Sequence, residues 1–298
     1  MSTGVVLFSH GSLLCGSEQA LRRHAERLKS YNVADIVEPG FLNYNSPSFA
    51  DGVASAVEQG ATRIIVAPYF LAPGKFVTYD LPRALQIEES RHPSVKFVLA
   101  QPLGFDERLA LAVTQSAEAA ASREYWRLDL ERAPAHCRYE AACPLFETDA
   151  CSRGSEKAAS NVLYQETIDP VGVEALLLMI HGSPRGNANE AALQIAELLR
   201  AQALFNCVKV GFMECNQPDI PTAIQSCVQS GADTITAVPY FLHTGTHVAD
   251  DLPTLLEAGA NQFPTVRFRM GRYLGCSPAL TDILRDRIQD ALDENSFV

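Results

Sequence analysis

Short apolar runs separated by amphipathic segments give this chain its pattern. Within the runs Val, Ile and Leu are nearly continuous, and in the segments between them apolar residues recur at helical spacing. Continuous apolar strands are typical of parallel sheets covered by helices on both faces, so the predicted fold class is α/β. The expected strands are 5–9, 36–42, 63–68, 95–100, 175–180, 208–213, 234–239 and 266–270. The expected helices are 18–29, 47–59, 81–90, 105–123, 189–202, 219–229, 252–258 and 278–292.

A tandem duplication explains why the pattern occurs twice. Three of the repeated motifs are His10-Gly-Ser12 with His181-Gly-Ser183, Pro68-Tyr-Phe-Leu71 with Pro239-Tyr-Phe-Leu242, and Asp80-Leu-Pro82 with Asp251-Leu-Pro253. Each pair is offset by 171 positions (181 − 10, 239 − 68, 251 − 80). A constant offset indicates one repeated unit without internal insertions. The sequence therefore predicts two tandem, doubly wound parallel-sheet lobes.

The lobe boundaries follow from the ends of the repeated pattern. Residues 1–123 are expected to form an N-terminal lobe, closed by a helix at 105–123, and residues 171–298 a C-terminal lobe. The segment 124–170 has no clear periodicity, so we interpret it as an elaborated linker. It carries three cysteines, Cys137, Cys143 and Cys151.

Composition excludes several classes of protein. The 298 residues carry a net charge of −11 without a basic patch, which argues against nucleic acid or an anionic membrane as the partner. No apolar run is long enough for a membrane span, and the N-terminus lacks the pattern of a signal peptide, so a cytoplasmic protein is expected. His24 and His92, flanked by charged residues, are expected to be solvated surface groups.

Potential metal ligands follow three predicted strands of the second lobe. They are His181, Glu214, His243 and His247. The carboxyl ends of neighbouring parallel strands lie about 4.8 Å apart, so these side chains are expected to converge at one edge of the sheet. Two imidazoles and a carboxylate suit a divalent first-row metal, although the set does not choose the ion. For His181 alone, a structural role in a turn that caps a helix stays open.

The first lobe lacks most of this set. His10 is retained, but Asn43, Ala72 and Phe76 stand where Glu214, His243 and His247 would be expected from the offset. A duplicated enzyme that keeps one active centre would show this asymmetry, with the other lobe serving as a wall or substrate platform. The alternative is that the histidines of the second lobe arose without a function.

The three motifs of the second lobe resemble those of the sirohydrochlorin chelatases of the CbiX and SirB type, within the class II chelatases. They are His181-Gly-Ser, Gly-Phe-Met-Glu214, and the stretch from Pro239 to Pro253. The resemblance covers both lobes and implies a fused two-lobe monomer, a lyase that inserts Co²⁺, Fe²⁺ or Ni²⁺ into sirohydrochlorin for cobalamin or siroheme synthesis. Cobalt is the first candidate.

Site roles also follow from the resemblance. It implies catalysis by His181, Glu214 and His247, with His243 as a further metal ligand. Sirohydrochlorin is a small molecule with many carboxylates, so Arg185, Lys75 and His10 are candidates for binding it. Ordinary surface charge is the alternative for Arg185 and Lys75.

Other functions remain open at this point. A non-catalytic carrier of tetrapyrrole or metal would keep the ligands without turnover, and a metallohydrolase would need a pocket motif that we do not find. Some fused members of the resembled family carry an iron-sulfur cluster. For Cys137, Cys143 and Cys151 unrelated thiols are favoured over such a cluster, because their spacing fits no standard pattern.

Overall fold

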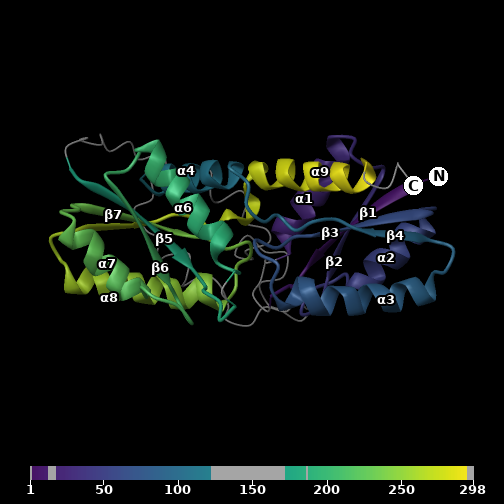
Figure 1. The fold of residues 1–298 in the computed structure, drawn as a ribbon, viewed down its shortest axis with the longest axis horizontal. Coiled ribbons are helices and arrows are strands. Elements are labelled where there is room, and N and C mark those ends of the chain that lie inside the picture. The colour runs from purple at the N-terminus through teal and green to yellow at the C-terminus, as the bar shows by residue number, and fades with distance from the viewer. Residues whose placement is uncertain (1, 13–17, 122–171, 186, 294–298) are drawn as a thin grey trace, which may run out of the picture. The chain divides into compact units, whose positions relative to one another are not determined.

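The structure is a computed structural model that describes residues 2–12, 18–121, 172–185 and 187–293. The chain divides into two compact units, shown with their elements in Figure 1. Of the described residues, the first lobe contains 2–12, 18–108 and 275–293, and the second contains 109–121, 172–185 and 187–274. The predicted linker at 124–170, with its three cysteines, lies outside the described residues.

The first lobe is a four-stranded parallel sheet with helices on both faces. Its strand order is β2 (Ile36–Phe41), β1 (Thr3–Ser9), β3 (Arg63–Pro68) and β4 (Lys96–Leu99). On one face α2 (Phe49–Glu58) and α3 (Leu81–Arg91) bury Val6 and Phe8 of the central strand. Helix α1 (Gln19–Ser30) packs with α9 (Pro278–Asp293), and α9 also contacts β3.

The second lobe repeats this arrangement. Its parallel sheet has the order β6 (Cys207–Phe212), β5 (Glu174–Ile180), β7 (Thr234–Pro239) and β8 (Arg267–Met270). Helices α7 (Ile220–Gln229) and α8 (Leu252–Gln262) cover Leu177 and Met179, while α6 (Glu190–Gln202) packs on β6. The register repeats as well, since Gly4 pairs with Ile36 and Ala175 with Cys207. The predicted α/β duplication is therefore confirmed.

The closing helices are exchanged between the lobes. Helix α4 (Arg108–Ala121), expected to close the first lobe, belongs almost wholly to the second, where the Ser116 hydroxyl donates to the carbonyl oxygen of Arg272 at 2.5 Å. Helix α9, expected in the second lobe, belongs to the first. The sequence therefore predicted the helix at 105–123 but assigned it to the wrong lobe. An amphipathic pattern shows that a helix packs on an apolar surface. It does not show which lobe provides that surface, because the two homologous lobes offer equivalent ones.

His24 is part of the contact between α1 and the segment that leads into α9. Its side chain is fully buried, with Nε2 at 2.7 Å from the Gly275 carbonyl oxygen and Nδ1 at 2.7 Å from the Thr281 hydroxyl. The expected surface position was wrong. Leu21, His24, Ala25 and Leu28 form the buried stripe of α1 at helical spacing, and the charged neighbours of His24 lie outside that stripe.

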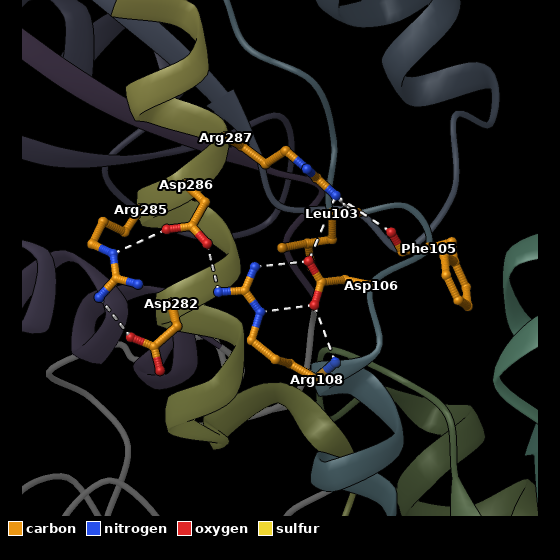
Figure 2. Close-up of polar contacts among 8 residues, drawn as sticks. All are labelled: Leu103, Phe105, Asp106, Arg108, Asp282, Arg285, Asp286 and Arg287. Carbon is orange, nitrogen blue, oxygen red and sulfur yellow. Dashed lines mark hydrogen bonds and ion pairs between the residues drawn. The ribbon is translucent and has the colours of Figure 1, made fainter. Parts of the chain in front are cut away.

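A charged cluster also holds α9 to the first lobe (Figure 2). The Arg108 guanidinium donates to both carboxylate oxygens of Asp106 at 2.8 Å and to Asp286 of α9 at 2.6 Å. From α9, Arg287 donates to the carbonyl oxygens of Leu103 at 3.1 Å and Phe105 at 3.3 Å. The Arg108 hydrogen bonds hold the pKa of Asp106 below its usual range. Planar two-point contacts of this kind are specific for Arg, so the cluster fixes the orientation of α9.

Each lobe inserts one π-helical turn between its third strand and the helix that follows. The turns are η1 (Phe76–Asp80) before α3 and η3 (His247–Asp251) before α8. The helix expected at 252–258 is thus preceded by this wider turn and runs to Gln262. π-Turns are rare and frequently occur at functional sites.

Within the described residues, no helix is long and apolar enough to cross a membrane.

Candidate active site

Two loops at the carboxyl ends of β5 and β6 are joined by backbone and amide contacts. The Glu214 N–H donates to the carbonyl oxygen of His181 at 2.9 Å, and the Ser183 N–H donates to Oδ1 of Asn216 at 2.7 Å. Gly182 between them has φ of +91°, and a Cβ there would overlap the backbone oxygen of Glu214. Only glycine fits such a position without strain. The His-Gly-Ser motif is therefore a turn shaped to bring His181 beside the Glu214 loop.

His181 and His247 face each other across neighbouring strand ends. Their ring centroids are 5.0 Å apart and the ring planes meet at 74°. His181 follows β5, and His247 opens the π-turn after β7, the strand that pairs with β5. Both side chains are half-buried. The structure thus brings together the two histidines that the sequence placed at one edge of the sheet.

Hydrogen bonds give both imidazoles the same tautomer. Nδ1 of His181 lies 3.0 Å from the carbonyl oxygen of Gly182, and Nδ1 of His247 lies 2.7 Å from Oδ2 of Asp251. A carbonyl or carboxylate oxygen accepts a hydrogen bond, so Nδ1 carries the proton in each neutral ring and Nε2 keeps its lone pair. Two Nε2 atoms are therefore available to bind an ion or to accept a proton. Carboxylate partners of this kind commonly orient metal-binding histidines.

Among the residues that it describes, the structure does not place Glu214 or His243 in a metal-binding group with the two imidazoles. The Glu214 side chain is exposed at the end of β6, and its backbone is tied to His181 as described above. His243 is half-buried after β7. Across the ranges that the structure describes, no three His, Cys, Asp or Glu residues are arranged to hold a metal ion. The structure therefore brings the two imidazoles together, and the roles of Glu214 and His243 stay predictions.

The first lobe presents aromatic rings in the equivalent place. His10 repeats the turn geometry, with Nδ1 at 2.9 Å from the carbonyl oxygen of Gly11. Phe76 stands where His247 is in the second lobe, with its ring centroid 4.2 Å from that of His10, and the Tyr44 ring is 5.7 Å away. The second-lobe edge therefore pairs two imidazoles, whereas the first-lobe edge has one imidazole against aromatic rings.

The predicted substrate-binding cations are accessible. Arg185 is exposed just after the His-Gly-Ser turn, where its N–H donates to the Ser183 hydroxyl at 3.2 Å. Lys75 is exposed immediately before η1 in the first lobe. Ser183 does not cap a helix, because α6 begins at Glu190 with Asn189 in the capping position.

Asp251 and Asn216 were missed by the sequence reasoning. The sequence marked Asp251 only as part of the repeated Asp-Leu-Pro motif and predicted no role for it in the site. Its position four residues after His247 was a usable signal, because side chains at that spacing meet on one face of a helical turn. The signal for Asn216 was its repetition as Asn45 at the same offset, and Asn45 Oδ1 accepts from the Ser12 N–H at 2.7 Å as Asn216 does from Ser183.

Comparisons with known proteins agree with this fold. The CbiX family model matches residues 4–120 and 175–291, once for each repeat, so the chain belongs to the CbiX family. A sirohydrochlorin cobaltochelatase of Priestia megaterium is 24% identical over 88% of this chain and 72% of that protein. A sirohydrochlorin ferrochelatase of the same organism is 23% identical over 97% of this chain and 90% of the relative.

Solved structures show the same architecture. SirB from Bacillus subtilis with Fe³⁺ superposes with a TM-score of 0.72 at 20% identity, covering 99% of this chain and 98% of the other. SirB from Bacillus subtilis subspecies spizizenii in complex with cobalt gives a TM-score of 0.68 at 19% identity, covering 99% and 97%. The predicted resemblance to this family and its duplicated fold are thus confirmed.

Proposed function

We propose that this protein is a chelatase that inserts a divalent metal ion, Co²⁺ or Fe²⁺, into sirohydrochlorin. The observation that carries the proposal is the pair of half-buried imidazoles in one lobe, each with its Nε2 available. Membership of the CbiX family and relatives named for both metals support the substrate class. Co²⁺ remains our first candidate, with Ni²⁺ a third.

Metal insertion requires two operations that His181 and His247 are suited to perform. The incoming ion must be brought to the macrocycle, and two pyrrole protons must be removed. Imidazole nitrogens bind divalent first-row metals and accept protons near neutral pH. In this proposal the metal is a substrate, and the two Nε2 atoms hold it or receive the displaced protons.

Glu214 and His243 complete the proposed site. Glu214 lies in the loop whose backbone is tied to His181, and we assign its exposed carboxylate to this site. A carboxylate there would ligate the ion or carry protons to solvent. His243, on the same β7 loop as His247, is proposed as a further ligand during metal entry.

Substrate recognition is assigned to cations and to the first lobe. Arg185 and Lys75 would pair with carboxylates of the macrocycle. The first-lobe edge, with His10 beside Phe76, offers a surface for a flat ring system rather than a second metal centre. In this proposal the protein acts as a monomer.

A direct assay distinguishes an enzyme from a carrier. Sirohydrochlorin is incubated without oxygen with Co²⁺, Fe²⁺ or Ni²⁺ and a small amount of protein, and insertion is followed by absorbance. An enzyme produces many equivalents of metallated product per chain. A tetrapyrrole or metal carrier changes the spectrum by no more than one equivalent and leaves the background insertion rate unchanged.

A further inference from the structure

A pocket of about 460 Å³ lies at the outer edge of β6 in the second lobe. It is bounded by α6, by β6 and the loop after it, and by α7. Its lining includes Leu193 and Phe212 as apolar groups and the amides of Asn189, Asn216 and Gln217. The size suits a small organic molecule, and the mixture of apolar and polar groups suits one with a polar end.

The backbone of Val210 faces this pocket. Along β6, alternate residues direct their N–H and C=O groups away from β5. The Val208 carbonyl oxygen accepts from Nε of Arg200 at 2.9 Å, and the Phe212 N–H donates to the Pro218 carbonyl oxygen at 2.9 Å. Between these two satisfied positions, the structure records no hydrogen bond for the outward groups of Val210 among the residues that it describes. The pocket therefore contains an available N–H donor.

The charges around the pocket favour an anion. Arg200 donates to Glu197 at 2.6 Å, so this pair contributes no net charge. Lys209 also lines the pocket, and the described part of the chain contains no ion pair for it. One net positive charge beside an available N–H is notable in a protein whose net charge is −11. A carboxylate would satisfy both donors.

The first lobe carries different residues at three of the equivalent positions. Pro39 is equivalent to Val210 and has no N–H. Glu38 is equivalent to Lys209, and it accepts from Gln59 at 2.8 Å and lies 3.8 Å from Lys29. Arg22 is equivalent to Leu193, and its guanidinium reaches across to the Ser46 carbonyl oxygen at 2.7 Å. At these three positions the second lobe has the shorter Leu193 in place of Arg22, a backbone N–H at Val210 in place of Pro39, and a positive charge at Lys209 in place of Glu38.

From this contrast we infer that the β6-edge pocket binds a small organic carboxylate, with its acid group on the Val210 N–H and Lys209 and its carbon chain against Leu193. The carboxylate belongs either to a free organic acid or to an acidic side arm of the tetrapyrrole substrate. Asn216 lines the pocket and also holds the His181 turn, so an occupant contacts a residue that anchors the proposed active site.

The test uses propionate as the probe and the amide of Val210 as the reporter. We expect propionate to shift the Val210 amide resonance saturably in ¹⁵N-labelled whole protein, and neutral propionamide to bind at least tenfold more weakly. Lys209→Glu, which introduces the first-lobe residue, and Lys209→Gln, which removes only the charge, should each weaken propionate binding at least tenfold with unchanged melting temperature. If one variant does not fold, the other still decides.

Two further outcomes separate the source of the carboxylate. A raised KM for sirohydrochlorin in Lys209→Glu indicates a substrate side arm, and an unchanged KM indicates a free acid. The inference is overturned if propionate leaves Val210 unmoved, if propionamide binds equally well, or if folded variants bind as the parent does. Propionate binding does not depend on metal insertion, so a failed chelatase assay leaves this test intact.

Discussion

Nδ1 of His247 lies 2.7 Å from Oδ2 of Asp251, across a single π-helical turn. The equivalent turn of the first lobe keeps the aspartate, Asp80, but replaces the histidine with Phe76. The carboxylate therefore has an imidazole to orient in only one lobe. This difference supplies a matched control within the same chain.

Asp251→Ala should impair metal insertion by releasing the His247 ring. The loss of such an orienting partner typically costs about 10- to 100-fold in metal affinity or activity. We expect the concentration of metal needed for half-maximal rate to rise, and Asp251→Asn to retain more activity because its amide oxygen still accepts from Nδ1. Asp80→Ala is the control. Equal losses in Asp251→Ala and Asp80→Ala would show that the aspartate serves the π-turn and not the histidine.

His181→Ala and His10→Ala should differ strongly. The first removes one of two facing imidazoles, and the second removes an imidazole packed against Phe76. Loss of a group that transfers protons typically costs about 100-fold or more, so His181→Ala should lose most activity while His10→Ala retains most. Initial insertion rates, with far-ultraviolet circular dichroism to check the fold, measure the difference. If both variants lose the same activity, His10 belongs to the working site.

Glu214→Gln tests whether charge matters at the end of β6. The variant keeps shape and hydrogen-bonding reach but removes the negative charge and the basicity. We expect an unchanged melting temperature, because Asn43 occupies the equivalent position in the folded first lobe. Insertion should slow roughly tenfold, equivalent to about 1.4 kcal/mol of barrier. Parental rates from pH 6 to 9 would instead show that the histidines suffice.

The charged cluster that holds α9 to the first lobe should make the free energy of unfolding depend on pH. Arg108 lowers the pKa of Asp106 in the folded protein, so the carboxylate contributes stability above its unfolded pKa of about 4. That contribution is lost as the pH falls through the lowered folded pKa. Asp106→Asn should therefore destabilise the protein at pH 7 by about 1–2 kcal/mol and by less near pH 2. Urea unfolding at the two pH values measures this, and an equal effect at both would contradict it.

The sequence predicted what depends on local pattern and repetition. The strands, the duplication and the pair of His181 and His247 follow from apolar runs and a constant offset, since parallel strand ends meet at one edge. The sequence could not predict the exchange of α4 and α9, because the apolar stripe of each helix fits the sheet of either lobe. His24 was misjudged from its charged neighbours, although the helical period placed it with Leu21 and Leu28.

His247→Phe tests the central claim most directly, because it gives the second lobe the residue that the first already carries. The measurement is anaerobic insertion of Co²⁺ or Fe²⁺ into sirohydrochlorin, followed by absorbance under multiple turnover, with melting temperature as the check on folding. Our account predicts a folded variant whose insertion rate falls to the background without protein. Insertion at the parental rate by folded His247→Phe would contradict the assignment of the second-lobe histidine pair as the metal-inserting site.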